Sequence, residues 1–466
     1  MAMVVIGVVI SELENVLITE PDELISVGLR RATVDEKDIT KRPLYGVKVL
    51  EIATILAIPS CAVHLSDMGA EVIKVESLTG DPHRYGIGPI LPNESKGFTV
   101  INRGKRSISL DLGNEKATEI IRKLVEQSDV VLLSLKLADL QKFGLCYEDL
   151  NNWNPSLIYL EHAPYGPKGP FSQEGGYDVV AAGMSGLASI LARDINGVPS
   201  DLTPAVADVA TGLASALAVV TALLHRNATG EGQKVSTSLL QTSLILAGNQ
   251  IHWFAATDPP AWERVGQELA EGQAKGAGFD EQRTIFKRIT NPGSGPATNT
   301  YFRNYRASDN FFAVGALSSA LQAKFCKVLD VMDPRTEDFD MNRSEDYDTL
   351  VQFTRRCEDI VRSQSADFWI SKLRQAGVPC GPFNFPHEVF DEEQIVVNEF
   401  VLSLEHSKLG EYKTYGTAIK MEKTPVFPTV SSPGLGEHTT QILEELGYSM
   451  DHIDQLIRDD VVIQAE

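Results

Sequence analysis

An aspartate in a stretch of small residues is the strongest candidate for chemistry in the sequence. Asp208 lies in AVADVATG, residues 205–212, within a predicted helix that is otherwise small and apolar. A carboxylate in such surroundings loses hydration, which raises its pKa and is costly unless something uses or pairs it. The small neighbours leave room for a substrate carbonyl, and the helix N-terminus favours the ionised form. The alternative interpretation is a late N-cap or a structural hydrogen bond.

Two further polar groups could line a pocket. Tyr177 and Asp178 end a loop rich in Gly and Pro, residues 165–177, of a kind that often shapes a pocket mouth. Capping of a helix by Asp178 is the alternative. Residues 102–106, NRGKR, form a basic cluster in an acidic chain, which could hold a phosphate or form a solvated turn.

Several catalytic sequence patterns are missing. The turn after the first predicted strand reads ATILAIPS and lacks G-x-G-x-x-G, which disfavours a Rossmann dehydrogenase, and no GxxxxGK[ST] loop indicates a P-loop ATPase. Ser185 lies in GMSGL, where Leu187 replaces the second glycine of a nucleophile elbow. The five cysteines form no C-x-x-C pair and the nine histidines no H-x-x-x-H spacing, so no metal is expected.

The charge balance restricts the partners. The 466 residues include 42 Lys and Arg against 63 Asp and Glu, a formal charge of −21. This disfavours nonspecific binding to nucleic acid or to an anionic membrane, since both need a basic surface. The scattered cysteines fit a reducing compartment. The apolar run at residues 3–10 is too short to span a bilayer and no basic residue precedes it, so we predict a cytoplasmic protein.

Strands and helices alternate in the first half of the chain. Strands are predicted at residues 47–52, 70–75, 108–112, 130–135 and 157–160. Helices are predicted at 57–68 and at 204–225, where Thr203 is the expected cap and Pro204 the first helical residue. A further helix is predicted after a cap at Asn114, because apolar residues at helical spacing within 117–125 form one face. Strands that alternate with helices predict a doubly wound α/β domain with parallel strands.

The second half of the chain indicates a different organisation. Residues 255–300 are polar and weakly periodic, which predicts a connector or lid. A hairpin is predicted at 301–317, helices at 318–330, 346–363 and 366–376, strands within 398–428 and a helical tail at 436–457. We therefore predict an N-terminal extension at 1–43, a large α/β domain beginning at 44–240, a linker or lid at 241–300, a small domain at 301–390 and a return segment at 391–466.

Segments spread over residues 44 to 460 resemble CoA-transferase family III, the group of formyl-CoA transferase, carnitine CoA-transferase and α-methylacyl-CoA racemase. They include residues 46–52, 67–76, 80–82, 102–112, 154–159, 176–180, 207–212, 230–233, 376–382 and 433–439. The resemblance implies a Rossmann-like large domain completed by the C-terminal segment, a smaller α+β domain, and a homodimer of two chains interlocked like linked rings.

The resemblance also implies the chemistry. The family's catalytic aspartate falls on Asp208, which would move CoA from an acyl-CoA to a carboxylic acid through an aspartyl anhydride and an aspartyl-CoA thioester, without a metal. Gly293 and Gly295 are the candidates for oxyanion stabilisation. The implied CoA-binding residues are Ile55, Leu56, Arg106, Leu110, Ser134, Leu135, Lys142, Tyr177 and Asp178.

Some positions depart from the family pattern. Tyr177 stands where racemases carry His, which disfavours a racemase. Leu56 replaces a polar residue of the formyl-CoA enzymes, residues 133–138 replace their E-N-F-x-P-G segment, and Lys142 replaces an Arg, whose planar bidentate contact Lys cannot make. An acyl-CoA isomerase or racemase, or a degenerate subunit of a hetero-oligomeric CoA-transferase, therefore remain alternatives to an active CoA-transferase.

Overall fold

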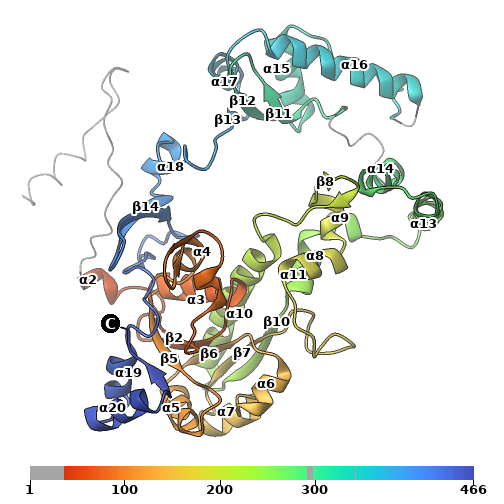
Figure 1. Cartoon of the computed structure of the whole chain (residues 1–466). Helices are drawn as coiled ribbons and strands as arrows, with labels where there is room; N and C mark the ends of the chain where they lie inside the picture. The colour runs from red at the N-terminus through yellow and green to blue at the C-terminus, as the bar shows by residue number, and fades with distance from the viewer. Residues whose placement is uncertain (1–35, 291–296, 342, 466) are drawn as a thin grey trace, which may run out of the picture.

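A parallel sheet forms the centre of the protein (Figure 1). The computed structural model describes residues 36–290, 297–341 and 343–465. The strands of the sheet are β1 (Lys48–Ile52), β2 (Glu71–Glu76), β5 (Lys105–Leu110), β6 (Val130–Leu133), β7 (Ile158–His162), β10 (Gln233–Thr237) and β16 (Val462–Ile463). Their order is β10-β7-β6-β1-β2-β5-β16, and only β16 is antiparallel to its neighbour.

Helices cover both faces of this sheet. The helices α3 (Ala57–Asp67) and α10 (Val206–Thr229) pack on one face. The other face carries α5 (Glu115–Glu126), α7 (Tyr147–Trp153), α19 (Thr439–Glu445) and α20 (Met450–Arg458). Since strand residues alternate between the faces, Val49 packs with α3 and α10 whereas Leu50 packs with α5 and α19. This double burial explains the continuous apolar strands of the sequence.

The strand order places a switch point beside β1. The chain runs from β1 outward through β2 and β5, and then crosses to β6, β7 and β10 on the other side of β1. The loops that follow β1 (residues 53–56) and β6 (residues 134–136) therefore leave the sheet in different directions. In open α/β sheets, ligands bind at the carboxyl ends of the strands at such a point.

A second core lies in residues 301–378. The strands β11 (Phe302–Arg306), β12 (Phe311–Gly315) and β13 (Cys380–Pro382) form an antiparallel sheet. The helices α15 (Ser319–Leu329), α16 (Ser344–Val361) and α17 (Ala366–Gln375) cover its buried face. These elements confirm the predicted hairpin and three helices. The domain boundaries stay predictions.

The connections to this second core are partly helical. Besides α8 (Asp178–Met184), α9 (Leu187–Leu191), α11 (Leu239–Leu246) and α12 (Gly248–Ile251), the chain contains α13 (Pro259–Ala274) and α14 (Phe279–Thr290). These two helices were not predicted, because the glycines of α13 obscure the helical spacing of Trp262, Val265 and Leu269. The role of the segment as a connector or lid stays a prediction. The chain returns through α18 (Glu393–Val397) and the ribbon β14 (Val401–His406) and β15 (Gly410–Tyr415).

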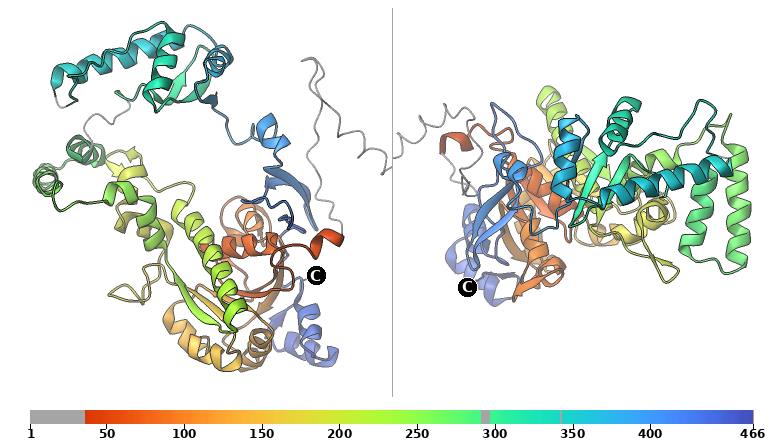
Figure 2. Two further views of the ribbon diagram at one scale, coloured as in Figure 1. Left: turned by 180° about the vertical axis from the view of Figure 1, so that it is seen from behind. Right: turned by 90° about the horizontal axis from the view of Figure 1, so that it is seen from above.

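The described parts of the chain are arranged as an open ring. In two opposite views, one arm rises from the large sheet through α11, α13 and α14, and the other descends through α18 and β14 (Figures 1 and 2). The C-terminal residues complete the large domain, because β16 pairs with β5 and α19 and α20 enter its core. The short elements are α2 (Glu36–Ile39), η2 (Pro82–Tyr85), β3 (Pro89–Leu91), β4 (Glu94–Ser95), α4 (Lys96–Val100), α6 (Leu137–Lys142), β8 (Asp194–Ile195) and β9 (Val198–Pro199).

Candidate active site

Asp208 lies in the first turn of α10, and a residue from another helix caps that turn. The helix begins at Val206 after Ala205, so the predicted cap at Thr203 and start at Pro204 were wrong. Instead, the Asp178 carboxylate accepts hydrogen bonds from the N–H groups of Ala207 (2.8 Å) and Asp208 (3.2 Å). These donors have no partner within the helix. Asp178 is therefore a helix cap, as one interpretation expected, but it caps α10 from the start of α8.

The surroundings of Asp208 disfavour its charge. Burial and, second, the negative charge of Asp178 raise the pKa of Asp208 from 3.8 to about 7. The positive end of α10 acts in the opposite direction. Near neutral pH the carboxylate is accordingly poised between its two protonation states, and as an anion it is poorly solvated. Both properties suit a nucleophile or an acid–base group.

Close packing of α10 against α3 fixes the position of Asp208. A Cβ atom on Gly212 would lie 1.9 Å from Ser60 Oγ and 2.8 Å from the Ala57 carbonyl oxygen, so only glycine permits this approach. One turn earlier, Ala207 packs with Ala57, the first residue of α3. The turn that carries Asp208 therefore lies beside the loop that follows β1.

Four of the predicted CoA-binding residues follow strand ends at the switch point. Ile55 and Leu56 lie in the loop after β1, and Leu56 is the residue before α3. Ser134 and Leu135 follow β6, and the Ser134 N–H donates to the Ile52 carbonyl oxygen (3.2 Å). All four leave the sheet at the edge where α10 begins. A CoA contact at these residues stays a prediction.

Two other predicted residues are accessible near the same edge. Tyr177 precedes α8 and its exposed fraction is 64%. Lys142 lies in the last turn of α6, exposed, with its ammonium group 5.0 Å from the centre of the Phe143 ring. Their contacts with CoA also stay predictions. Gly293 and Gly295 lie outside the described residues.

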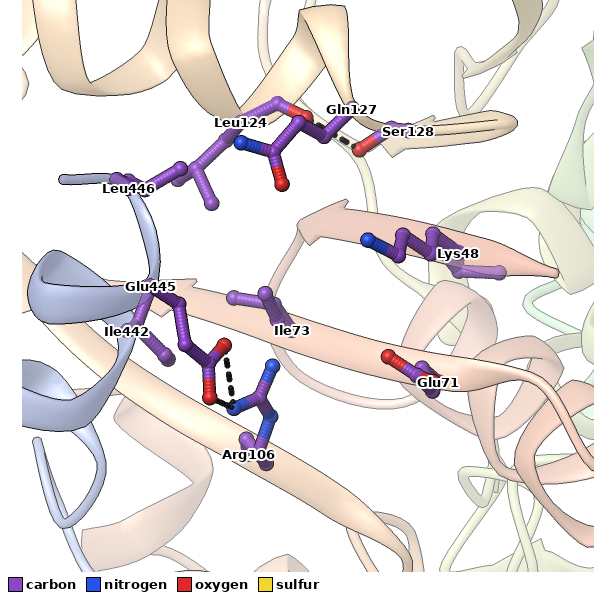
Figure 3. Close-up of a pocket in the computed structure, with 11 residues that line it drawn as sticks. Lys48, Glu71, Ile73, Arg106, Leu124, Gln127, Ser128, Ile442, Glu445 and Leu446 are labelled. Atoms are coloured by element: carbon purple, nitrogen blue, oxygen red, sulfur yellow. Dashed lines mark hydrogen bonds and ion pairs between the residues drawn. The ribbon is translucent and has the colours of Figure 1, made fainter. Parts of the chain in front are cut away.

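The structure places Arg106 and Leu110 away from Asp208. Arg106 lies near the amino end of β5 and pairs with Glu445 of α19 (2.7 Å) in a small pocket (Figure 3). Leu110 is buried in the core between the sheet and α5. Both side chains point to the face opposite α10. A role of either residue in CoA binding remains a prediction that this placement does not favour.

Two residues of the basic cluster at 102–106 are buried in ion pairs, so they form neither a solvated turn nor an open phosphate site. Arg103 is buried and pairs with Asp67 (2.7 Å), and it donates to the carbonyl oxygens of Tyr415 and Gly416. Lys105 is buried and pairs with Glu51 (2.7 Å). Two of the cluster's charges thus form ion pairs in the interior, and one of them binds the returning C-terminal segment.

Sequence reasoning missed the buried charges beneath the loop after β1. Glu51 and Lys74 interrupt two apolar strands and lie directly opposite each other in register. Charged residues at core positions of neighbouring strands were the available signal. Within the described parts of the chain, no three His, Cys, Asp or Glu side chains are arranged to hold a metal ion.

α10 also has the length and composition of a helix that could cross a membrane. Core helices of soluble proteins pass the same test, so this is weak evidence. Here the face that includes Ala207, Gly212, Ser215 and Val219 is buried against the rest of the protein. The predictions that the protein is cytoplasmic and has no membrane partner are not tested by this feature.

Known proteins resemble this chain along most of its length. The family model of CoA-transferase family III matches residues 44–439. The human succinyl-CoA:glutarate CoA-transferase is 31% identical over 435 residues, which cover 91% of each chain. The succinate–glutarate CoA-transferase of Agrobacterium fabrum is 30% identical over 419 residues, 87% of this chain and 96% of that protein.

Solved structures show the same fold. A CAIB/BAIF family protein from Brucella suis has a TM-score of 0.67 and 29% identity, over 87% of this chain and 99% of that one. The protein Rv3272 from Mycobacterium tuberculosis has a TM-score of 0.66 and 25% identity, over 86% and 98%. Together with the family match, these similarities show that the chain belongs to CoA-transferase family III and is an enzyme of the transferase class.

Proposed function

We propose that the protein transfers CoA from an acyl-CoA to a carboxylic acid through Asp208. The observation that carries the proposal is the placement of Asp208: a partly buried carboxylate with its pKa raised to about 7, in the first turn of α10 at the switch-point edge of the sheet. An active-site carboxylate can act as a covalent nucleophile.

The reaction balances without water or ATP. A carboxylate oxygen of Asp208 attacks the thioester carbonyl carbon, the C–S bond breaks, and CoA leaves as the thiolate, which gives a mixed anhydride. The thiolate then attacks the aspartyl carbonyl carbon and releases the donor acid as its carboxylate, which gives an aspartyl-CoA thioester. The acceptor carboxylate attacks the carbonyl carbon of this thioester, the C–S bond breaks, and CoA leaves again as the thiolate, which gives a second mixed anhydride. The thiolate finally attacks the acceptor's carbonyl carbon and restores the Asp208 carboxylate.

The named relatives suggest the substrates to try first. Enzymes named for succinyl-CoA, succinate or glutarate are 31% and 30% identical to this chain across most of their length. We therefore propose succinyl-CoA as donor and a dicarboxylic acid such as glutarate as acceptor. Leu56 near the switch point favours acids with a methylene chain over oxalate or formate, since apolar side chains bind methylene groups better than they bind a small anion without them.

We also propose that the enzyme is an interlocked homodimer. One side of α10 exposes an apolar stripe that consists of Val209, Leu213, Leu217 and Leu224, with exposed fractions from 45% to 70%. Exposed apolar surface of this extent marks an interaction site in a soluble protein. The open ring of the chain would allow a second copy to pass through it (Figure 2).

Replacement of Asp208 tests the function. Asp208→Ala should lower the rate of CoA transfer from succinyl-CoA to glutarate by about a thousandfold or more, because Asp208 is the residue that carries the covalent intermediates in the proposed mechanism. Asp201→Ala is the matched control, since Asp201 is an exposed aspartate outside α10, and it should retain the wild-type rate. A wild-type rate in the Asp208 variant would disprove the proposal. Exchange of the α-hydrogen with solvent deuterium in the absence of an acceptor would instead indicate an isomerase.

A further inference from the structure

Four charged side chains are buried together beneath the loop that follows β1. Glu51 lies on β1, Lys74 on β2, Lys105 on β5, and Asp81 in the loop after β2; all four side chains are completely inaccessible to solvent. Lys74 Nζ lies 2.8 Å from Glu51 Oε1 and 3.0 Å from Asp81 Oδ2. Lys105 Nζ lies 2.7 Å from Glu51 Oε2. The two positive and two negative charges balance.

Three backbone groups of one short stretch of chain are bound to this network. Lys74 Nζ donates to the Ala53 carbonyl oxygen (2.7 Å), and Lys105 Nζ donates to the Pro59 carbonyl oxygen (2.9 Å). Asp81 Oδ1 accepts a hydrogen bond from the Ile55 N–H (3.1 Å). The network therefore holds both ends and the middle of the loop between β1 and the first turn of α3.

The middle of this loop has a strained backbone. Ile55 has a φ of +71°, a conformation that is costly for a β-branched residue. Such strain persists only where the surrounding structure enforces it. Asp81 enforces it directly, because its carboxylate holds the Ile55 N–H and is itself held by Lys74.

Stability alone does not account for these buried charges. Replacing a buried ion pair by well-packed apolar residues is often neutral or stabilising, so the charges require another explanation. The loop they hold contains Ile55 and Leu56 and leads to Ala57, which packs on Ala207, the neighbour of Asp208. A shift of this loop would thus change the surroundings of Asp208.

We propose that Asp81 and Lys74 are positioning residues, which hold the loop at residues 53–56 in its strained conformation and so set the geometry beside Asp208. The proposal rests on the proposed function, because it assigns the loop to the reacting site. It does not require either side chain to touch the substrate. The proposal has a specific consequence for the residue at position 55. Glycine adopts a positive φ without strain, so the loop should depend less on Asp81 when Gly replaces Ile55.

A double-mutant cycle tests this dependence. Asp81→Ala should lower kcat by about tenfold or more, with a smaller change in KM for succinyl-CoA, because misplacement of a site by about 1 Å is costly. In an Ile55→Gly background the same replacement should lower kcat by less than about threefold, since contacting residues couple. Asp67→Ala breaks the equally buried pair with Arg103, which does not touch the loop, and is the matched control. Its effect should be the same in both backgrounds.

Hydrogen exchange provides a second readout that needs no activity. In Asp81→Ala, backbone exchange of residues 53–57 should accelerate by about tenfold or more, whereas Asp67→Ala should leave this segment unchanged. If Asp81→Ala does not fold, Asp81→Asn replaces it, with a smaller effect of the same sign. Equal losses of kcat in the two backgrounds, or unchanged exchange of residues 53–57, would overturn the inference. Absence of CoA transfer in the wild type would disprove the proposed function, and the exchange measurement would still decide the role of Asp81.

Discussion

A substitution at Asp178 can remove the negative charge beside Asp208 and still keep the hydrogen bonds that cap α10. Asp178→Asn keeps a side-chain oxygen that can accept from the N–H groups of Ala207 and Asp208, so α10 stays capped. The negative charge, which is the second cause of the raised pKa of Asp208, is lost. The pKa of Asp208 should therefore fall.

The size of this change follows from the causes of the raised pKa. The pKa rises from 3.8 to about 7, and burial is the larger cause, so the charge of Asp178 accounts for less than half of the rise. Less than half of this rise is roughly one pKa unit, which corresponds to about 1.4 kcal/mol. We expect the pKa of Asp208 to fall by about that amount, to about 6.

The pH dependence of acyl-enzyme formation measures this pKa. With succinyl-CoA and no acceptor, the second-order rate constant of this single-turnover step reports the ionisation of the free enzyme. It should rise with pH as Asp208 ionises, with a midpoint near pH 7 in the wild type. The midpoint should lie about one unit lower in Asp178→Asn. Asp178→Ala, which also removes the cap, should in addition lower the free energy of unfolding by about 1 kcal/mol. An unchanged or higher midpoint in Asp178→Asn would refute the reasoning.

Three other predictions concern stability and assembly. Gly212→Ala should lower the free energy of unfolding by about 1–3 kcal/mol, because its Cβ would overlap Ser60 Oγ, whereas Gly266→Ala, in open space on α13, should not be destabilising; urea unfolding distinguishes them. Leu217→Glu should prevent assembly of the proposed dimer, so that the purified variant sediments as a monomer, whereas Met332→Glu, also exposed but outside α10, should not. Asp208→Asn should be more stable than the wild type by about 1–2 kcal/mol at pH 8, after discounting for partial exposure. The raised pKa means that Asp208 costs stability as it ionises, so this advantage should vanish as the pH falls below about 4, and a gain that persists there would contradict the assignment.

The sequence was most informative where local patterns determine structure. The apolar spacing of residues 117–125 predicted the buried face of α5, and the Asn114 side chain caps it as expected. For Asp208, the small neighbours indicated a partly desolvated carboxylate near a helix N-terminus, and the structure has one. These features depend on residues within a few positions of each other.

Features that depend on distant residues could not be predicted in the same way. The cap of α10 comes from Asp178, thirty residues before Asp208, so the nearby Thr203 was the wrong candidate. Arg106 lies two residues before Ile108 on β5, so both side chains point to the face of the sheet that α19 covers. Which face that is depends on how the strands pair, and the sequence alone does not show it. The network around Lys74 combines residues from three neighbouring strands, β1, β2 and β5, which long stretches of chain separate in the sequence.

The most direct test of the central claim is to detect the covalent intermediate on Asp208. The wild-type protein is mixed with succinyl-CoA and other acyl-CoAs, and its intact mass is measured before and after hydroxylamine treatment. We predict a mass increase that matches bound CoA or acyl, lost with hydroxylamine and located on Asp208 by peptide mapping. Binding of acyl-CoA without an adduct from any donor, or an adduct that persists in Asp208→Ala, would contradict the account.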